Sequence, residues 1–448
     1  MNMGIWDYGT MGLMDLGADG AQLARRASRP ASSVSSTRRI GGWIVVGLLS
    51  VSPASSAFNL EAQVAIRGAI VYTMSGAPIK DGVILTDKNG NISAVGPASS
   101  VKIPSGTKML SAKVVTPGLI DAHSVVGLAG YLNYNHDQDQ LDTSSPMQPQ
   151  LRAVDAYNAR ERLVEWVRGY GITTLHTGHG PGALMSGQTM VVKTRGNTVE
   201  AALVDSATML AMTLGPEAED NGKGKSPGTR AKGVAMVRAE FLKAQHYLDQ
   251  IAKDTAPDKK PARDLELETV ARVLQGKMPA LITAHEMPDI LAALRLQKEF
   301  GFKLVLDGAS ESYLLIDEIK AAGVPVILHP TMMRTGGITA SATLETAHKL
   351  IAAGIPVALQ SGYEGYVPKT RVVLFEAGMA AANGLTTEEA LATITSSAAK
   401  IIGQEKRIGS LEVGKDADIV LYDGDPFEWT THVCTVLIEG SVVADSCK

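Results

Sequence analysis

Histidine side chains are concentrated at the ends of short apolar segments in this sequence of 448 residues. Five of the nine histidines lie at or just beyond a run that reads as a buried strand: His123, His176, His179, His285 and His329. Asp307 and Glu364 occupy comparable places. Imidazole and carboxylate groups are common ligands of divalent metals, and a bound metal activates water for hydrolysis. The chemistry that this set suggests is therefore metal-assisted hydrolysis.

Strands and helices alternate through the middle of the chain. The clearest strand and helix pairs are residues 280–284 with 287–300, 303–306 with 310–322, 324–328 with 344–353, and 355–359 with a helical tail to 402. Strands buried on both faces, each followed by an amphipathic helix, predict a parallel sheet. Six or more such units without a dinucleotide-binding glycine motif favour an α/β fold with a closed (β/α)8 barrel of the TIM type. A polar stretch at 217–230 is expected to form a long loop at the barrel mouth.

Short alternating strands flank this region on both sides. They are expected at residues 63–72, 82–86, 91–95 and 108–111 before it, and at 418–422, 435–439 and 441–444 after it. Neither end has enough strands to bury a core alone, so we expect the two ends to pair into one small β-sandwich. The predicted domains are residues 58–115 and 405–448 for the two parts of the sandwich and 116–404 for the barrel.

The first 57 residues have the pattern of a leader. Arg38 and Arg39 precede an apolar run at 40–49, and small residues follow at 50–57. This order is typical of a secretory signal peptide, although an incidental apolar patch in a leader is the alternative. The run is shorter than the roughly 20 residues that span a bilayer. We therefore expect an exported protein, periplasmic or secreted, with no membrane span in its mature chain.

The net charge bears on the expected partners, and the two cysteines bear on a possible disulfide. The net charge is −4, and no stripe of Lys and Arg with interleaved aromatics suggests nucleic-acid binding. The two cysteines, Cys434 and Cys447, fall on or beside a hairpin that is predicted to turn at residues 439–440. They are expected to lie diagonally across it, at a separation that an oxidising compartment could close into a disulfide. Two unpaired thiols are the alternative.

Several ordered segments resemble the amidohydrolase superfamily. Residues 115–123, VTPGLIDAH, resemble its first barrel strand, and residues 408–426, IGSLEVGKDADIVLYDGDP, resemble its return into a β-sandwich. Segments 150–158, 187–196 and 285–301 are similar to its imidazolonepropionase-like branch. The resemblance implies a hydrolase that cleaves a carbon–nitrogen bond of a small amide- or peptide-like molecule. The implied cofactor is a divalent metal, with zinc expected, which activates the attacking water.

The metal motif of that family is only partly present. The resemblance assigns metal ligands to His123 and His285, but the second histidine of the family's His-x-His falls on Val125. The family's histidine after the sixth strand falls on Gly308, and its aspartate after the eighth strand falls on Gly362. Zinc usually takes at least three protein ligands, and the aspartate also shuttles the proton.

Two interpretations follow from this departure. In the first, the site is rebuilt with help from other side chains, and the chain is a metal-dependent hydrolase; the candidates are His176, His179, Asp307 and His329. In the second, the chain is a catalytically inactive barrel that binds a ligand or a partner, as a homo-oligomer or beside an active paralogue. For each histidine alone, the alternative is a polar residue that hydrogen-bonds to a loop. Residues 186–188 are interpreted as a backbone-shaping turn, and Lys193 as a solvated or barrel-lining charge.

Overall fold

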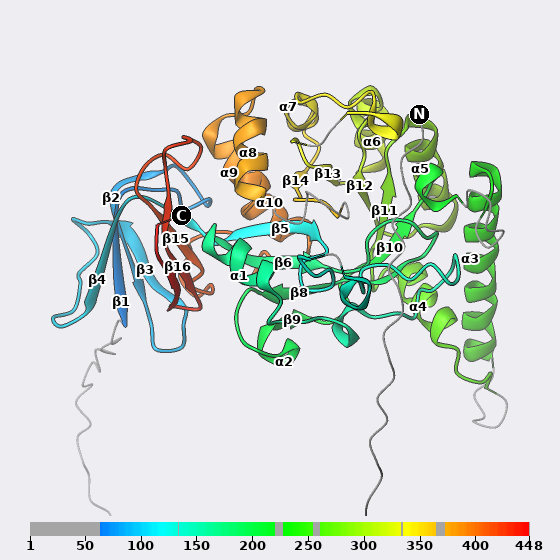
Figure 1. Cartoon of the computed structure of the whole chain (residues 1–448), viewed down its shortest axis with the longest axis horizontal. Helices are drawn as coiled ribbons and strands as arrows, with labels where there is room; N and C mark the ends of the chain where they lie inside the picture. Colours follow the sequence, from blue (N-terminus) through cyan, green and yellow to red (C-terminus); the bar gives the residue numbers. More distant parts are fainter. Residues whose placement is uncertain are drawn as a thin grey trace, which may run out of the picture. The chain divides into compact units, whose positions relative to one another are not determined.

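The computed structural model of the chain describes residues 63–132, 134–219, 227–253, 260–332, 335–363 and 372–447. The expected signal peptide, Glu364 and half of the expected loop at 217–230, namely residues 220–226, lie outside these residues. The fold is mixed α/β, with strands from both chain ends and alternating strands and helices between them (Figure 1). None of the described helices is long and apolar enough to cross a membrane.

Strands from the two ends of the chain share one seven-stranded sheet, in the order β17-β16-β15-β4-β1-β2-β3. These strands are β1 (Val64–Val71), β2 (Ile79–Thr86), β3 (Ile92–Pro97), β4 (Lys108–Pro117), β15 (Ile419–Tyr422), β16 (Val433–Ile438) and β17 (Ser441–Asp445). The antiparallel pairing of β4 with β15 joins the two ends, and Val115 lies opposite Leu421 there. Apolar side chains of both ends bury one another in a common cluster that includes Ile66, Val115 and Ile419. The strands therefore form one continuous sheet, with a core that neither end could bury alone.

The middle of the chain contributes two further sheets. Five parallel strands follow one another in the first: β10 (Leu210–Thr213), β11 (Ala280–Ala284), β12 (Leu304–Gly308), β13 (Val326–Leu328) and β14 (Val357–Leu359). The second has the order β5-β6-β8-β9, with β5 (Leu119–Ser124), β6 (Ile172–Thr177), β8 (Met190–Lys193) and β9 (Leu203–Asp205). A parallel bridge between Ser124 and Gly362 connects the end of β5 to the residues just beyond β14.

One segment runs opposite to the expected parallel direction. The short strand β7 (Gly187–Gln188) pairs antiparallel with β10, and β8, which begins after Thr189, pairs antiparallel with β6. The same stretch of chain therefore connects the two sheets. A parallel crossover needs about a dozen residues or more. The connection from β6 to β8, residues 178–189, is at that limit and contains no helix, and β8 returns antiparallel beside β6.

Helices separate most of the central strands. They are α1 (Arg162–Gly169), α2 (Val199–Ala202), α3 (Arg230–Lys253), α4 (Leu265–Leu274), α5 (Met287–Phe300), α6 (Ile316–Ala322) and α7 (Thr346–Ala352). The expected helical tail to residue 402 is divided into α8 (Val373–Ala382), α9 (Thr387–Thr393) and α10 (Ser396–Ile401). Gly384, with a φ of 115°, follows α8, and Thr386 begins α9 through a capping box with Glu389. These residues end one helix and start the next.

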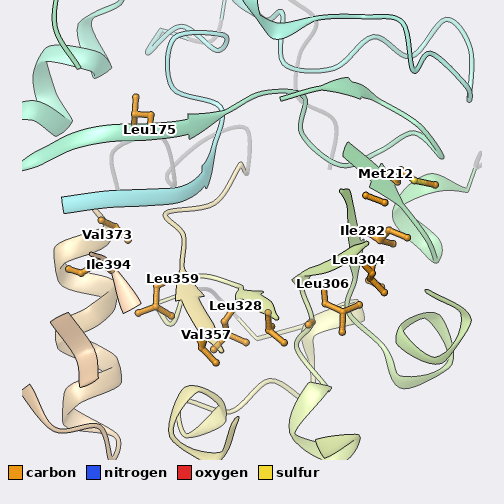
Figure 2. Packing of buried hydrophobic residues seen from close by; sticks show 14 of the residues in the cluster. Leu175, Met212, Ile282, Leu304, Leu306, Leu328, Val357, Leu359, Val373 and Ile394 are labelled. Carbon is orange, nitrogen blue, oxygen red and sulfur yellow. The ribbon is translucent and has the colours of Figure 1, made fainter. Parts of the chain in front are cut away.

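The two faces of the central strands contact different apolar cores. On one face of the strands, the apolar side chains pack against one another and against the small residues of α10. This cluster includes Ile120, Val191, Leu281, Val305, Ile327 and Ala358. Their neighbours on the same strands pack with the helices in a larger cluster, and Figure 2 shows Ile282, Leu306, Leu328 and Leu359 in it. Because alternate residues of a strand point to opposite faces, the strands are buried on both.

A disulfide joins Cys434 to Cys447 at the terminal hairpin. The hairpin turns at residues 439–440, both with positive φ, so its predicted turn is confirmed. A register shift within the hairpin puts Thr435, and not Cys434, opposite Asp445. The bridge holds the chain end against β16.

Lys193 is a buried ion-pair residue, so the solvated alternative of its interpretation is wrong. It lies at the end of β8 with 1% of its surface exposed. Its ammonium group donates a hydrogen bond to Asp418 and lies 3.1 Å from Asp416 Oδ2. Both carboxylates belong to the segment that leads into β15. One buried charge cluster therefore connects the central strands to the terminal sheet.

Replacing this lysine should destabilise the whole chain. In Lys193→Met the carboxylate of Asp418 stays buried without its cation, and removing one partner of a buried pair costs about 3–5 kcal/mol. Urea denaturation should show this loss in the free energy of unfolding. Lys400→Met, which removes an exposed lysine, should change it by no more than about 0.5 kcal/mol. Equal effects of the two substitutions would contradict a stabilising role for the pair.

Candidate functional site

The carboxylate of Asp307 is the centre of a buried polar cluster at the carboxyl ends of the central strands. It lies on β12, and its Oδ2 accepts a hydrogen bond from the Thr283 hydroxyl at 2.6 Å. Its Oδ1 accepts one from Gln360 Nε2 at 2.8 Å and lies 3.1 Å from His123 Nδ1. Both Asp307 and His123 are almost fully buried. Residues from β5, β11, β12 and the segment after β14 therefore meet at one carboxylate.

The contact between His123 and Asp307 is an ion pair without an aligned hydrogen bond. The nitrogen and oxygen are close, yet neither ring nitrogen of His123 makes a hydrogen bond. Burial opposes a charged imidazole, but Asp307 and Asp121 outweigh it and raise the pKa of His123 above its ordinary value. Burial likewise opposes a charged carboxylate, but His123 and the hydrogen bond from Thr283 hold the pKa of Asp307 below its ordinary value. Both shifts favour the charged pair.

A second buried carboxylate, Asp121, was not among the predicted site residues. The backbone N–H of Ser361 donates to its Oδ1 at 3.0 Å, and the Ser361 hydroxyl donates to its Oδ2. Burial raises the pKa of Asp121 to about 6, although Ser361 and His123 act in the opposite direction. Side chains two residues apart on a strand point to the same side, so the position of Asp121 before His123 was a usable signal. The sequence carried no such signal for Gln360.

His176 lies beside His123, but both ring nitrogens of His176 are already hydrogen-bonded to other groups. The two ring centroids are 6.0 Å apart. Nδ1 of His176 donates to the carbonyl oxygen of Ala122 at 2.6 Å, and its Nε2 accepts from the Thr189 hydroxyl at 2.7 Å. Burial lowers its pKa to about 3, so the ring is neutral near pH 7. It holds β6 against β5 and has no free nitrogen for a metal.

His285 and His329 extend the cluster along the ends of β11 and β13. Nδ1 of His285 is hydrogen-bonded to the Ser310 hydroxyl at 2.7 Å, and its Nε2 lies 3.7 Å from the Glu217 carboxylate. Nδ1 of His329 donates to the carbonyl oxygen of Pro330 at 2.8 Å, and its Nε2 has no hydrogen-bond partner. Burial lowers both pKa values, that of His329 to about 4. Each ring therefore keeps one nitrogen for another contact.

The backbone conformation leaves little room for a side chain at two of the positions where the resemblance implies metal ligands. Gly308 has a φ of 71°, and a Cβ there would lie 2.6 Å from Cε1 of the His285 ring. Gly362 has a φ of 89°, and a Cβ there would lie 2.7 Å from Cγ of Pro330. A left-handed backbone with so close a neighbour disfavours any side chain. Val125, the third departure, is buried by packing.

The described residues at these strand ends do not fit a metal held by three protein ligands. Within the described part of the chain, the one cluster of three donor side chains close enough to share an ion is Asp423 with Cys434 and Cys447. Those cysteines are joined in a disulfide, so they offer no thiolate. His123 and Asp307 supply two donors at one point, whereas zinc usually takes at least three.

A polar cavity of about 310 Å³ lies next to His179. Asp139, Asp142 and Arg152 are among the residues that line it. His179 is 5% exposed, and neither of its nitrogens makes a hydrogen bond. Burial lowers its pKa to about 4, opposed by the charge of Asp142. A neutral imidazole has one donor and one acceptor nitrogen, and both nitrogens of His179 are buried here.

Gly187 leaves the space that the His179 ring occupies. Its φ is 138°, and a Cβ there would lie 2.3 Å from Cδ2 and 2.6 Å from Nε2 of His179. The segment 186–188, expected to shape the backbone, therefore also positions an imidazole. The Ser186 hydroxyl donates to the carbonyl oxygen of Ala183 at 3.5 Å. This agrees with its interpretation as a turn residue and not a nucleophile.

Adding one methyl group at Gly187 should expose the imidazole. In Gly187→Ala the new Cβ displaces the His179 ring, and its pKa should rise from about 4 towards the ordinary value of about 6.5. An NMR titration of histidine-labelled protein measures this shift. Gly106→Ala is the control, because Gly106 also has a positive φ but nothing within 4 Å of a Cβ. An unchanged His179 pKa in Gly187→Ala would contradict this role of the glycine.

Comparisons with known proteins agree with the resemblance seen in the sequence. A sequence model described as "Amidohydrolase family" matches residues 282–444. The imidazolonepropionase of Solibacter usitatus is 25% identical over 377 residues, covering 78% of this chain and 86% of that protein. The imidazolonepropionase of Fusobacterium nucleatum is 27% identical over 369 residues, covering 77% and 85%. Amidohydrolase tasK of Hapsidospora irregularis is 23% identical over 78% of this chain, which spans 38% of its length.

The structure is also similar to a crystal structure of an amidohydrolase from Thermotoga maritima. The TM-score is 0.80 at 29% identity, and the match covers 85% of this chain and all of that one. This likeness extends over the terminal sheet and the central strands together. Together these similarities support the amidohydrolase superfamily, and its imidazolonepropionase-like branch, as the family that this chain resembles.

Proposed function

We propose that this chain is an exported protein of the amidohydrolase superfamily that binds a small amide- or peptide-like molecule at the carboxyl ends of its central strands. The binding does not use a metal-bound hydroxide held at the family positions. The cavity next to His179 offers hydrogen-bond donors and acceptors together with charges of both signs, as a polar ligand of this class requires.

A closed (β/α)8 barrel is part of this proposal. Strand pairings run from β14 to β10, through residues 187–193 to β6 and β5, and the bridge between Ser124 and Gly362 joins the first strand to the last. Side chains from around this ring share one interior cluster. Such a barrel brings its strand ends together at one mouth. The likeness to the Thermotoga maritima amidohydrolase supports this arrangement.

The observation that carries the proposal is that protein groups already occupy both carboxylate oxygens of Asp307. Its oxygens already have Thr283, Gln360 and His123 as partners, and the backbone at Gly308 leaves no room for another ligand beside His285. The nitrogens of His179, in contrast, have no partner at all. A buried polar atom without a hydrogen bond costs about 1–3 kcal/mol. A ligand in the adjacent cavity would supply the missing bonds.

Export and assembly belong to the proposal as well. The order of charged, apolar and small residues in the first 57 residues supports export. The disulfide between Cys434 and Cys447 also supports it, because disulfides form and persist in oxidising compartments. The chain would act as a homo-oligomer or beside an active paralogue. A neighbouring gene that encodes a related chain with an intact His-x-His would favour the paralogue.

Cleavage of a carbon–nitrogen bond by metal-activated water is the second candidate. One observation favours it: His123 Nδ1 and Asp307 Oδ1 are 3.1 Å apart without a hydrogen bond between them. Two ligands of a tetrahedral zinc, each about 2.0–2.1 Å from the ion, are separated by a similar distance. The further ligand would come from His285, His329 or a residue outside the described part of the chain, such as Glu364.

Metal content separates the two candidates. For the binding protein we expect far less than one equivalent of any divalent metal in the purified chain, and a melting temperature that a chelator leaves unchanged. Asp307→Asn should still lower the free energy of unfolding by about 3–5 kcal/mol, because it removes the counter-charge of buried His123. Asp317→Asn, on an exposed carboxylate, is the matched control. One equivalent of metal that disappears in His123→Ala and in His285→Ala would establish the second candidate instead.

A thermal-shift screen with dipeptides and N-acetylated amino acids tests the binding site. We expect at least one compound to raise the melting temperature by several degrees, because a ligand that binds only the folded state stabilises it. His179→Ala should abolish that shift, whereas His246→Ala, on an exposed histidine of α3, should keep it. A shift that survives in His179→Ala would exclude the cavity beside this histidine as the site.

A further inference from the structure

A second cavity, of about 440 Å³, lies between α8 and the segment that connects β15 to β16. Its walls include Tyr170, Phe375, Met379, Phe427, Glu428 and Trp429. None of the polar residues gathered around Asp307 or His179 lines it. Its volume falls in the range of about 300–1,000 Å³ that small-molecule sites occupy. The cavity is therefore a candidate ligand site separate from the one proposed above.

Four aromatic rings form a row along this cavity. The ring centroids are 5.1 Å apart for Trp166 and Tyr170, 5.6 Å for Tyr170 and Phe375, and 6.0 Å for Phe375 and Trp429. Trp429 is 86% exposed, and Phe375 is 38% exposed. Leaving so much aromatic surface in water forgoes the stabilisation that burial would give. Exposed rings that line a concave site are typical of ligand recognition.

The charge of the cavity selects the class of ligand. Glu428 is among its described lining residues, and no Lys or Arg is. The His432 ring, also on the wall, is hydrogen-bonded through Nδ1 to Asp423 at 2.9 Å. An anion would meet Glu428 and the negative faces of the aromatic rings, whereas a cation would be attracted by both.

We propose that this cavity binds an organic cation, namely a tertiary or quaternary ammonium compound with small apolar substituents. The rings of Trp429 and Phe375 attract the cation through their π-electrons and cover its apolar substituents. The carboxylate of Glu428 supplies the counter-charge. An inorganic cation does not fit, because apolar and aromatic side chains make up most of the wall and hold no set of oxygen ligands.

Calorimetric titration of the full mature chain with choline and with 3,3-dimethylbutan-1-ol tests this proposal. The two probes have nearly the same shape and differ in charge. We expect choline to bind at least roughly fivefold more tightly, which lies within the range measured for cation–π attraction. Glu428→Gln should reduce this preference, because it removes the counter-charge at constant shape. Trp429→Ala should remove choline binding, and Trp429→Phe should restore most of it.

Trp166→Phe is the matched control, because Trp166 stands in the aromatic row but does not line the cavity. It should bind choline like the unmodified chain, and circular dichroism should show all four variants folded. The proposal is overturned by equal affinity for both probes, by a lack of saturable choline binding, or by unchanged binding in Trp429→Ala. Each of these outcomes is independent of the metal content and of binding beside His179.

Discussion

A buried carboxylate must be compensated within the protein, and that requirement governs the centre of this molecule. Asp307 is removed from water at the end of β12, where an unpaired charge would cost several kcal/mol. Its compensation comes from His123, Thr283 and Gln360, which belong to different strands or strand ends. The positions of these strands relative to one another are therefore linked to one group. A ligand that drew His123 or Gln360 away from Asp307 would have to supply the carboxylate with an equivalent charge or hydrogen bond.

Lys193 satisfies the same requirement at the other end of the chain's central strands. Its ammonium group is as buried as Asp307, and its compensation comes from two carboxylates of the segment that leads into β15. Amphipathic periodicity cannot reveal such a pair, because the lysine precedes its partners by more than 200 residues in the chain. A lysine in a strand is most often solvated, and only the fold brings its partners within reach.

Periodicity predicted most of the fold, and the misses have identifiable causes. Alternating strands and helices between residues 280 and 359 were recognised, because each strand there is a short apolar run followed by an amphipathic helix. The direction of β7 and β8 was missed, since a strand has the same pattern of buried residues in either direction. The division of the helical tail was encoded locally, by Gly384 and by the capping residue Thr386.

The membership of the site was predictable in part, but its chemistry was not. His123, His176 and Asp307 were named together because each was expected at the carboxyl end of a central strand, and they lie together in the structure. Whether a ring nitrogen is free depends on the nearest carbonyl or hydroxyl, such as that of Ala122 for His176. Contacts of this kind join residues far apart in the chain, so no local sequence pattern encodes them.

The two glycines at positions where the resemblance implies metal ligands leave little room for a ligand side chain in this backbone. The His285 ring packs where a side chain on Gly308 would begin, and Pro330 does the same at Gly362. Both glycines also hold left-handed backbone conformations that side chains rarely adopt. Restoring a histidine at Val125 would supply one ligand but would leave both of these obstacles in place. A metal site built at those family positions would therefore require coordinated changes of backbone and side chains at several strand ends, and a chain with only some of these changes would carry the strain without the metal's stabilisation.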